Sequence, residues 1–371
     1  MNAKAAEPKS PAEERSLDPE DWEELRQLGH QAFDDMLEYL KSVRDRPAWQ
    51  PLPSAARKLF EQDLPRQGIG LGEVYEQIRD HVLPYPTGNI HPRFWSWVGG
   101  TGTPAQLIAD LVASAMNSAS LGFDEVASSY VELQLLNWLK SLLGYAADSS
   151  GLLVSGGSMA NLVGLAVART HAAPYDVRDQ GINTSDYPRL IYYMSSEGHS
   201  SLRKAIELLG LGSASLRIVP VKDDFTIDVD ALRTAIRDDR QAGRLPACII
   251  ATAGTVNTGA IDPLNELADI AEQENLWMHA DAAFGGFAKL SAESAHLVDG
   301  LEHADSLAFD LHKWLYVQYD CGCVLIKSSD THRNTFSVIP SYLRKFDRGL
   351  GLPCHNWSTC YVRVSRYWRN R

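Results

Sequence analysis

A lysine beside apolar residues is the most unusual feature of this sequence. Lys313 lies in DSLAFDLHKWLYVQYDCGCVLIK, residues 305–327, directly after a segment with the pattern of a buried β-strand. Removing an ammonium group from water is costly, so a lysine in such surroundings needs a partner or a chemical task. At the end of a buried strand, its amine can lose the proton and attack carbonyl groups.

A second segment predicts a phosphate site. In LLVSGGSMANLVGLAVAR, residues 152–169, an apolar strand leads into Gly157 and Ser158 at the start of a strong helix. Free amides and the positive end of the helix dipole favour a phosphate there. The alternative is a simple glycine turn with a serine cap, because the segment matches neither known nucleotide-binding glycine motif.

Two further polar residues also follow apolar strands. His199 begins a helix in SSEGHSSLRKAIELLGLG, where it either caps the helix or stacks on a planar ring and relays protons. Asp281 ends the strand of WMHADAAFGG, and an ionised carboxylate there needs a cation or hydrogen-bond donors. Gly285 and Gly286, which follow it, are expected to leave room for a bulky group against the backbone. A helix cap is one alternative role for Asp281. A metal bound with His279 is another, although no third ligand is evident.

These four features together describe a site for pyridoxal 5'-phosphate. Its phosphate requires the glycine-serine helix start, and its pyridine nitrogen requires a carboxylate that keeps the ring protonated. Its aldehyde requires an amine to form a Schiff base. The combination is far more specific than any member alone.

The elements that position these residues alternate between strands and helices. Strands are predicted at 189–195, 216–221, 247–254, 276–281, 306–310 and 322–327. Helices are predicted at 104–118, 126–143, 158–171, 199–209, 228–241 and 263–274. This order predicts an α/β fold with a mostly parallel, buried sheet, in which ligands bind beyond the carboxyl ends of the strands.

The N-terminal part has a different pattern. Residues 1–17 have the composition of a disordered tail, and Asp18 before Pro19 predicts a helix start. This amphipathic helix is expected to run to about Arg44, followed by a proline-rich connector and a helix at about 72–82. Such an arm is expected to pack on another surface, for instance that of a second subunit.

Composition excludes several classes of partner. The 371 residues carry 35 basic and 47 acidic side chains, a net charge of -12, which argues against nucleic acids and anionic membranes. The five cysteines show neither a disulfide framework nor metal-site spacing. The N-terminus lacks an apolar signal region, and no apolar run reaches membrane-spanning length. We therefore expect a reducing, cytoplasmic setting.

Over about residues 72–345 the chain resembles the pyridoxal-phosphate-dependent group II amino-acid decarboxylases, which include aromatic-L-amino-acid, histidine and glutamate decarboxylases. The resemblance is carried by His312-Lys313-Trp314, by HADAAFGG, by GTVNTGAIDP (254–263) and by HPRFWSWVGGTGTPAQLIADL. It implies a fold-type I enzyme that converts an L-amino acid to an amine and CO2. It also implies a homodimer with the active site at the interface.

The resemblance also implies roles for individual residues. Lys313 would hold the cofactor as a Schiff base, Asp281 would pair with the ring nitrogen, and His199 would stack on the ring. Phosphate would bind at Gly157 and Ser158, and the pocket would be completed by Thr255, Asp310 and His312. Tyr342, in IPSYLRKFDRG (339–349), would return a proton to the substrate carbon after CO2 leaves.

The implied domains are a tail (1–17), a helical arm (18–90), a cofactor-binding large domain (91–330) and a catalytic loop with part of a small domain (331–371). Family members continue into a larger C-terminal domain, so low stability or activity is expected of a chain ending at Arg371. Two alternatives remain open, namely aldehyde synthesis on the same scaffold and an inactive dimerisation remnant. Phe94, Trp95 and Trp97 favour an aromatic substrate, whereas Arg93 fits an acidic one.

Overall fold

The protein is described here from a computed structural model, which covers residues 18–118 and 126–337. The chain divides between Phe94 and Trp95 into two compact units. The predicted tail at 1–17 and the predicted loop tyrosine, Tyr342, lie outside the described residues. The domain boundaries inferred from the resemblance stay predictions.

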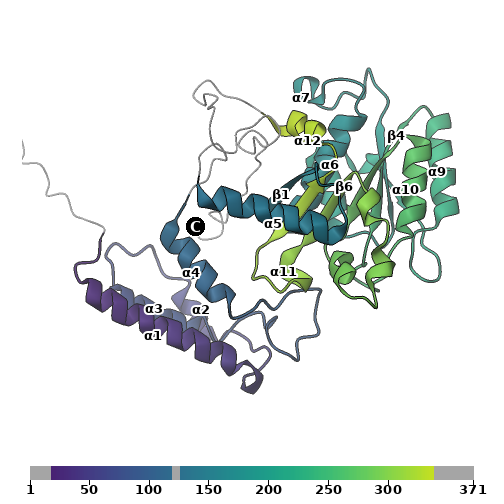
Figure 1. Ribbon diagram of the computed structural model, residues 1–371. Helices are drawn as coiled ribbons and strands as arrows, with labels where there is room; N and C mark the ends of the chain where they lie inside the picture. The colour runs from purple at the N-terminus through teal and green to yellow at the C-terminus, as the bar shows by residue number, and fades with distance from the viewer. Residues whose placement is uncertain (1–17, 119–125, 338–371) are drawn as a thin grey trace, which may run out of the picture. The chain divides into compact units, whose positions relative to one another are not determined.

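The first unit is helical. It contains α1 (Trp22–Lys41), a short 3-10 helix (Val43–Asp45), α2 (Ser54–Leu59) and α3 (Leu71–His81) (Figure 1). Neither α1 nor α3 contains a buried residue. Helix α2 lies inside the segment predicted as a proline-rich connector, so that prediction missed one helix.

The predicted start of the first helix was wrong. Asp21, not Asp18, caps α1, because its carboxylate accepts the amides of Glu23 at 2.7 Å and Glu24 at 3.2 Å. Both glutamates lie in the first turn, where their negative charges interact favourably with the positive end of the helix dipole. The pair Asp18-Pro19 has the composition of a cap but lies three residues too early.

The second unit is built on a seven-stranded sheet in the order β1-β7-β6-β5-β4-β2-β3. Its strands, in chain order, are β1 (Ser150–Val154), β2 (Leu190–Ser195), β3 (Leu216–Val219), β4 (Leu245–Thr252), β5 (Trp277–Asp281), β6 (Ser306–Asp310) and β7 (Gly322–Ile326). All six predicted strands are present, five of them with an end shifted by one or two residues and 306–310 as predicted. The predicted α/β class with a mostly parallel sheet is confirmed.

One strand of this sheet runs against the others. β7 pairs antiparallel with β6 and with β1, and the remaining neighbours pair in parallel. Because β1 and β6 are both opposed to β7, they run in the same direction. The carboxyl ends of β1, β2, β4, β5 and β6 therefore meet at one edge of the sheet, where ligand sites form in such folds.

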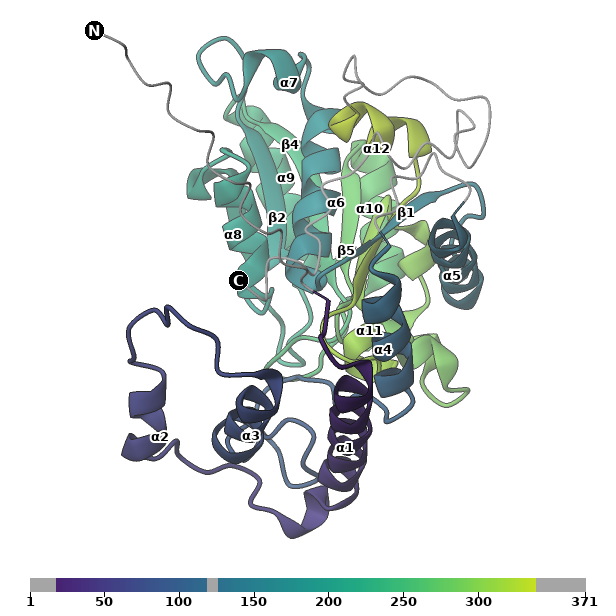
Figure 2. The same cartoon turned by 90° about the vertical axis from the view of Figure 1, so that its left-hand side faces the viewer.

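Helices cover both faces of the sheet (Figure 1). On one face pack α6 (Gly157–Ala172), which Figure 2 shows lying across the strands, and α8 (Ser200–Leu208). On the other face pack α5 (Ala127–Leu143), α9 (Val229–Gln241) and α10 (Leu264–Glu274). Buried side chains pack between the sheet and the helices on both faces, so the sequences of the strands are nearly continuous apolar runs.

Alternation along β5 aims particular residues at α6. Trp277 belongs to the core beneath α6, whereas Met278 and Ala280 belong to the opposite core. Because side chains on a strand alternate between faces, His279 and Asp281 share the face of Trp277. The sequence WMHAD thus directs both polar side chains to the same helix.

The remaining helices of this unit are α4 (Gln106–Met116), α7 (Val177–Gln180), α11 (Leu311–Trp314) and α12 (Ser329–Phe336), with short 3-10 helices at 213–215, 285–290, 295–298 and 301–303. The helix α12 was not predicted. Among the described residues, no helix is both long and apolar enough to cross a membrane.

Candidate active site

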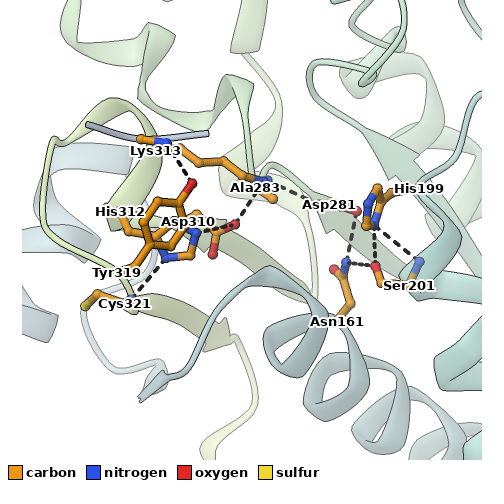
Figure 3. A network of polar contacts seen from close by, with 11 residues as sticks. Asn161, His199, Ser201, Asp281, Ala283, Asp310, His312, Lys313, Tyr319 and Cys321 are labelled. Carbon is orange, nitrogen blue, oxygen red and sulfur yellow. Dashed lines mark hydrogen bonds and ion pairs between the residues drawn. The ribbon is translucent and has the colours of Figure 1, made fainter. Parts of the chain in front are cut away.

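A pocket of about 350 Å³ opens at the carboxyl edge of the sheet. It is lined by all eight predicted cofactor residues, namely Gly157, Ser158, His199, Thr255, Asp281, Asp310, His312 and Lys313. They come from five different strand ends or helix starts. Figure 3 shows some of them in two groups, with Asp281 and His199 on one side and Asp310, His312 and Lys313 on the other.

Lys313 lies in the single turn α11, three residues after the end of β6. Its Nζ atom is 3.0 Å from Oδ2 of Asp310, and 19% of its side chain is exposed. The lysine is therefore not sealed in the core. The buried neighbours expected from the sequence are those of β6, and the amine itself reaches the pocket with a carboxylate as its partner.

Glycines enclose the Asp310 carboxylate. A Cβ atom at Gly157 would lie 3.0 Å from Asp310 Oδ2, and one at Gly322 would lie 2.9 Å from Asp310 Oδ1 and 2.5 Å from Gly156 Cα. The turn after β1 and the start of β7 can approach this closely only because they have no side chains. Asp310 Oδ1 is fully buried and has no hydrogen-bond partner among the described residues.

Asp281 is the second buried carboxylate of the pocket, with 4% of the residue exposed. Its Oδ1 accepts the amide of Ala283 at 3.2 Å, and its Oδ2 accepts Nδ2 of Asn161 at 2.9 Å. In the described part of the chain, it forms no ion pair with a lysine, arginine or histidine. A buried carboxylate without a protein cation is suited to a cationic ligand.

His279 does not form a metal site with Asp281. Its Nδ1 lies 2.7 Å from Ser306 Oγ, and its Nε2 lies 2.9 Å from Asn161 Oδ1, so both ring nitrogens are occupied. Burial lowers the pKa of His279 to about 4, which keeps the ring neutral. The metal alternative is therefore not supported by the structure.

His199 caps a helix at the pocket, and its stacking on a planar ring stays a prediction. It is the N-cap of α8, with Nδ1 accepting the amide of Ser201 at 3.2 Å and lying 2.7 Å from Ser201 Oγ. The residue also lines the pocket. Because the cap holds one ring nitrogen, the ring is fixed at the pocket wall.

Thr255 lines the pocket while its hydroxyl is engaged nearby. Its Oγ1 lies 2.6 Å from Thr258 Oγ1 and accepts the amide of Ala260 at 3.2 Å. The residue is buried within the turn that follows β4. Thr255 thus shapes the turn as well as the pocket wall.

His312 is held by the segment that follows it. Its Nδ1 accepts the amide of Cys321 at 3.0 Å, and its ring lies 4.3 Å from the ring of Tyr319. The Tyr319 hydroxyl accepts the amide of Gly100 at 2.7 Å. A Cβ atom on Gly100 would collide with the carbonyl of His312, so residue 100 packs directly on the lysine-bearing turn.

One expectation about the pocket was wrong. Gly285 and Gly286 do not leave space for a ligand, because Cβ atoms there would meet the carbonyl of Ala253 at 2.5 Å and Ala282 Cβ at 3.1 Å. Their role is close backbone packing. Trp97 is 80% exposed and is not part of the pocket wall, to which its neighbour Val98 belongs.

Sequence reasoning also missed polar pocket residues, chiefly Asn161, Ser201 and Tyr319. Asn161 had a usable signal, since it is a polar residue in the apolar helix that starts at Gly157. It lies one turn after Gly157, on a helix that is apolar nearly all round. A buried asparagine there requires partners, which predicts a polar network at the pocket.

The residues present fit pyridoxal phosphate. The helix α6 is 16 residues long and begins at the pocket, where its first amides have no acceptor within the helix. Asp281 is a buried carboxylate that lacks a protein cation, as a protonated ring nitrogen would require. Lys313 supplies an amine at the same pocket.

Comparison with known proteins defines the class. Residues 53–369 match the pyridoxal-dependent decarboxylase conserved domain. The chain therefore belongs to the pyridoxal-dependent decarboxylases.

Individual relatives agree with this assignment. The chain is 35% identical over 349 residues to an aromatic-L-amino-acid decarboxylase of Bacillus atrophaeus, covering 94% of this chain and 70% of the relative. It is 28% identical to a phenylacetaldehyde synthase of Petunia hybrida, covering 88% and 65% of the two chains. The structure of Oryza sativa TDC with PLP and tryptamine superposes with a TM-score of 0.80 at 28% identity, over 89% and 69%.

These matches confirm the predicted family, the fold-type I scaffold, the cofactor and the carboxy-lyase class. The chain spans about two thirds of the length of the relatives it matches. The roles assigned to individual residues are not tested by the matches.

Proposed function

We propose that this protein binds pyridoxal phosphate through Lys313 and decarboxylates an aromatic L-amino acid, releasing the amine and CO2. The observation that carries this proposal is the convergence of Lys313, Asp281 and the start of α6 on one pocket. When bound, the cofactor supplies an aldehyde that condenses with amines and a ring that accepts the electron pair left by CO2.

Each part of the cofactor has a counterpart in the pocket. The amides of Gly157 and Ser158 would hold the phosphate at the helix start. Asp281 would hold a proton on the ring nitrogen, and two donors already fix the orientation of its carboxylate. His199, fixed by its cap, would support the ring from one side.

Asp310 holds the amine of Lys313 between reaction steps. The 3.0 Å ion pair directs Nζ towards the pocket. The Asp310 carboxylate would pair with the ammonium group whenever Lys313 is not bonded to the cofactor. Tyr342 lies outside the described residues. Its proposed task, taken from the family resemblance, is to deliver a proton to the substrate α-carbon.

The walls of the pocket support an aromatic substrate. Val98, Val256, Phe284 and Tyr319 contribute apolar surface. The Phe284 ring lies 4.6 Å from that of Trp314 in an edge-to-face arrangement, which stiffens this wall. Relatives named for aromatic amino acids, tyrosine and tryptophan lend independent support.

The test is CO2 release by the cofactor-loaded protein over a panel of aromatic, acidic and aliphatic L-amino acids, with Lys313→Ala as control. We expect release from an aromatic substrate by the wild type and none by the variant. Release only from an acidic or aliphatic substrate would contradict the substrate class. Release by the variant would contradict the role of Lys313.

Aldehyde synthesis is a second candidate, since a phenylacetaldehyde synthase is among the relatives. Product analysis separates the two reactions. Decarboxylation yields the amine, whereas the alternative yields ammonia and the aldehyde. We expect the amine as the main product.

We further propose that the protein is a homodimer. α4 buries none of its residues although most of them are apolar, and α5 adds exposed apolar side chains. The exposed residues of this surface are Ile108, Leu111, Val112, Met116, Val131 and Trp138. Apolar patches of this kind are typical of interfaces.

Light scattering should give a dimer mass, with Leu111→Glu shifting it to the monomer, and a monomeric wild type would contradict the proposal.

A reducing, cytoplasmic location is proposed on the basis of the cysteines. Cys248 and Cys323 carry free thiols, and burial raises the pKa of both. Such thiols need no oxidising compartment. Fractionation of the source cells tests the location.

A further inference from the structure

Asn161 connects the two sides of the cofactor pocket. It lies in the second turn of α6 and only 1% of it is exposed. Its Nδ2 donates to Asp281 Oδ2 at 2.9 Å and to Ser201 Oγ at 3.2 Å, while its Oδ1 lies 2.9 Å from His279 Nε2. The carboxamide thus uses both hydrogens and its oxygen in buried contacts. Figure 3 shows the two contacts made by Nδ2.

The direction of these hydrogen bonds follows from the groups that can only donate or only accept. An ionised Asp281 can only accept, so Asn161 must present Nδ2 to it and Oδ1 to His279. His279 Nε2 therefore carries the proton. The ring is neutral, so its Nδ1 is the acceptor, and the Ser306 hydroxyl donates to it at 2.7 Å.

The hydrogen bonds at the other end of this series, around Ser306, have the same direction. The indole nitrogen of Trp277 can only donate, and it donates to Ser306 Oγ at 2.7 Å. Ser306 Oγ then has its own hydrogen free for His279. Four side chains therefore form one continuous, buried series that ends on the Asp281 carboxylate.

A branch of the same network reaches His199. Ser201 Oγ accepts from Asn161, and His199 Nδ1 already accepts the amide of Ser201. The hydroxyl of Ser201 must therefore donate to His199 Nδ1, over 2.7 Å. Asn161 therefore helps to orient the Ser201 hydroxyl towards His199 at the pocket wall.

We propose that Asn161 is a positioning residue that holds the Asp281 carboxylate in the orientation required for the ring nitrogen, and that Trp277, Ser306 and His279 hold its amide in the required orientation. The inference rests on the proposed function, in which Asp281 faces the ring nitrogen. It predicts that Asn161 contributes to cofactor binding through that nitrogen rather than through general packing.

The test compares two cofactors in the full chain. One is pyridoxal phosphate, and the other is its carbocyclic analogue, in which CH replaces the ring nitrogen. Asn161→Asp keeps the size of the side chain but turns an acceptor towards Asp281. We expect the wild type to prefer pyridoxal phosphate and the variant to lose about tenfold of that preference, as for one hydrogen bond to a charged group.

Asn257→Asp is the matched control. Asn257 Nδ2 also donates to a carboxylate, that of Glu197 at 3.0 Å, but this pair lies at the exposed rim. The same change there should leave the preference unaltered. If Asn161→Asp does not fold, Ser306→Ala replaces it, with an expected loss of roughly threefold because its effect passes through His279.

The possible outcomes separate the two claims. A folded Asn161→Asp protein that binds both cofactors more weakly by the same factor would overturn the inference, because its effect would then be general packing. An unchanged preference in Ser306→Ala would do the same where that variant replaces it. A wild type that binds both cofactors equally would overturn the assignment of Asp281 in the proposed function, and the inference with it.

Discussion

Nζ of Lys313 and Oδ2 of Asp310 lie 3.0 Å apart across one helical turn at the end of β6. The carboxylate belongs to the last residue of a buried strand, and the amine reaches into the pocket. The pair explains how a lysine can follow an apolar strand without carrying an unpaired charge into the core.

Replacing Asp310 by asparagine tests this pair. The change keeps the shape but removes the charge, so Lys313 loses a charge-assisted contact. We expect affinity for pyridoxal phosphate to fall roughly tenfold, measured by fluorescence titration. Asp299→Asn is the control, because it also pairs with a lysine, Lys289 at 2.6 Å, but lies outside the pocket. Equal losses in both variants would refute a specific role for Asp310.

Gly164 should not tolerate a side chain. A Cβ atom there would lie 2.6 Å from Cε1 of His279 and 3.2 Å from Ser306 Oγ. We expect Gly164→Ala to lower the free energy of unfolding by about 1–3 kcal/mol, measured by urea denaturation. Gly29→Ala, also inside a helix but with nothing within 4 Å, should raise it by about 0.5–1 kcal/mol. A neutral Gly164→Ala protein would show that α6 does not pack on His279.

Stability should fall in mild acid because of two buried histidines. Burial lowers the pKa of both His279 and His332 from 6.5 to about 4. Below pH 6.5 the unfolded chain takes up these protons, but the folded chain does so only near pH 4. Their contribution is therefore present above pH 6.5 and is lost as the pH falls towards 4.

His332→Phe isolates one of these two histidines. Between pH 6.5 and 4.5, the variant should lose about 2 kcal/mol less unfolding free energy than the wild type. Any packing cost of the substitution is the same at both pH values and cancels in this comparison. Ser150, whose hydroxyl contacts His332, keeps the carbonyl of Ile326 as an acceptor at 3.3 Å. His303→Gln, which alters an exposed histidine, should leave the pH dependence as it is. An unchanged slope in His332→Phe would contradict a neutral, buried His332.

Much of the fold and site could be predicted because local signals agreed. The alternating apolar segments predicted the sheet, and polar residues at strand ends predicted Asp281 and Lys313. The reversed direction of β7 was not predicted. In retrospect, only residues 311–321 separate it from β6, which is short for the crossover that a parallel pair requires.

The errors have physical causes as well. Asp18 and Asp21 both resemble helix caps, and only the position of the following amides decides between them. The glycines after Asp281 looked like space for a ligand, but the backbone of a distant turn occupies it. The network around Asn161 joins residues up to 120 positions apart, so only the folded chain brings them together.

Borohydride reduction of the pyridoxal-phosphate-loaded protein, followed by peptide mass spectrometry, tests the central claim most directly. Reduction makes the bond between a lysine amine and the cofactor aldehyde permanent. We predict that the peptide containing Lys313 gains the mass of one phosphopyridoxyl group and that Lys313→Ala gains none. An unmodified Lys313, or equal labelling of other lysines, would contradict the account.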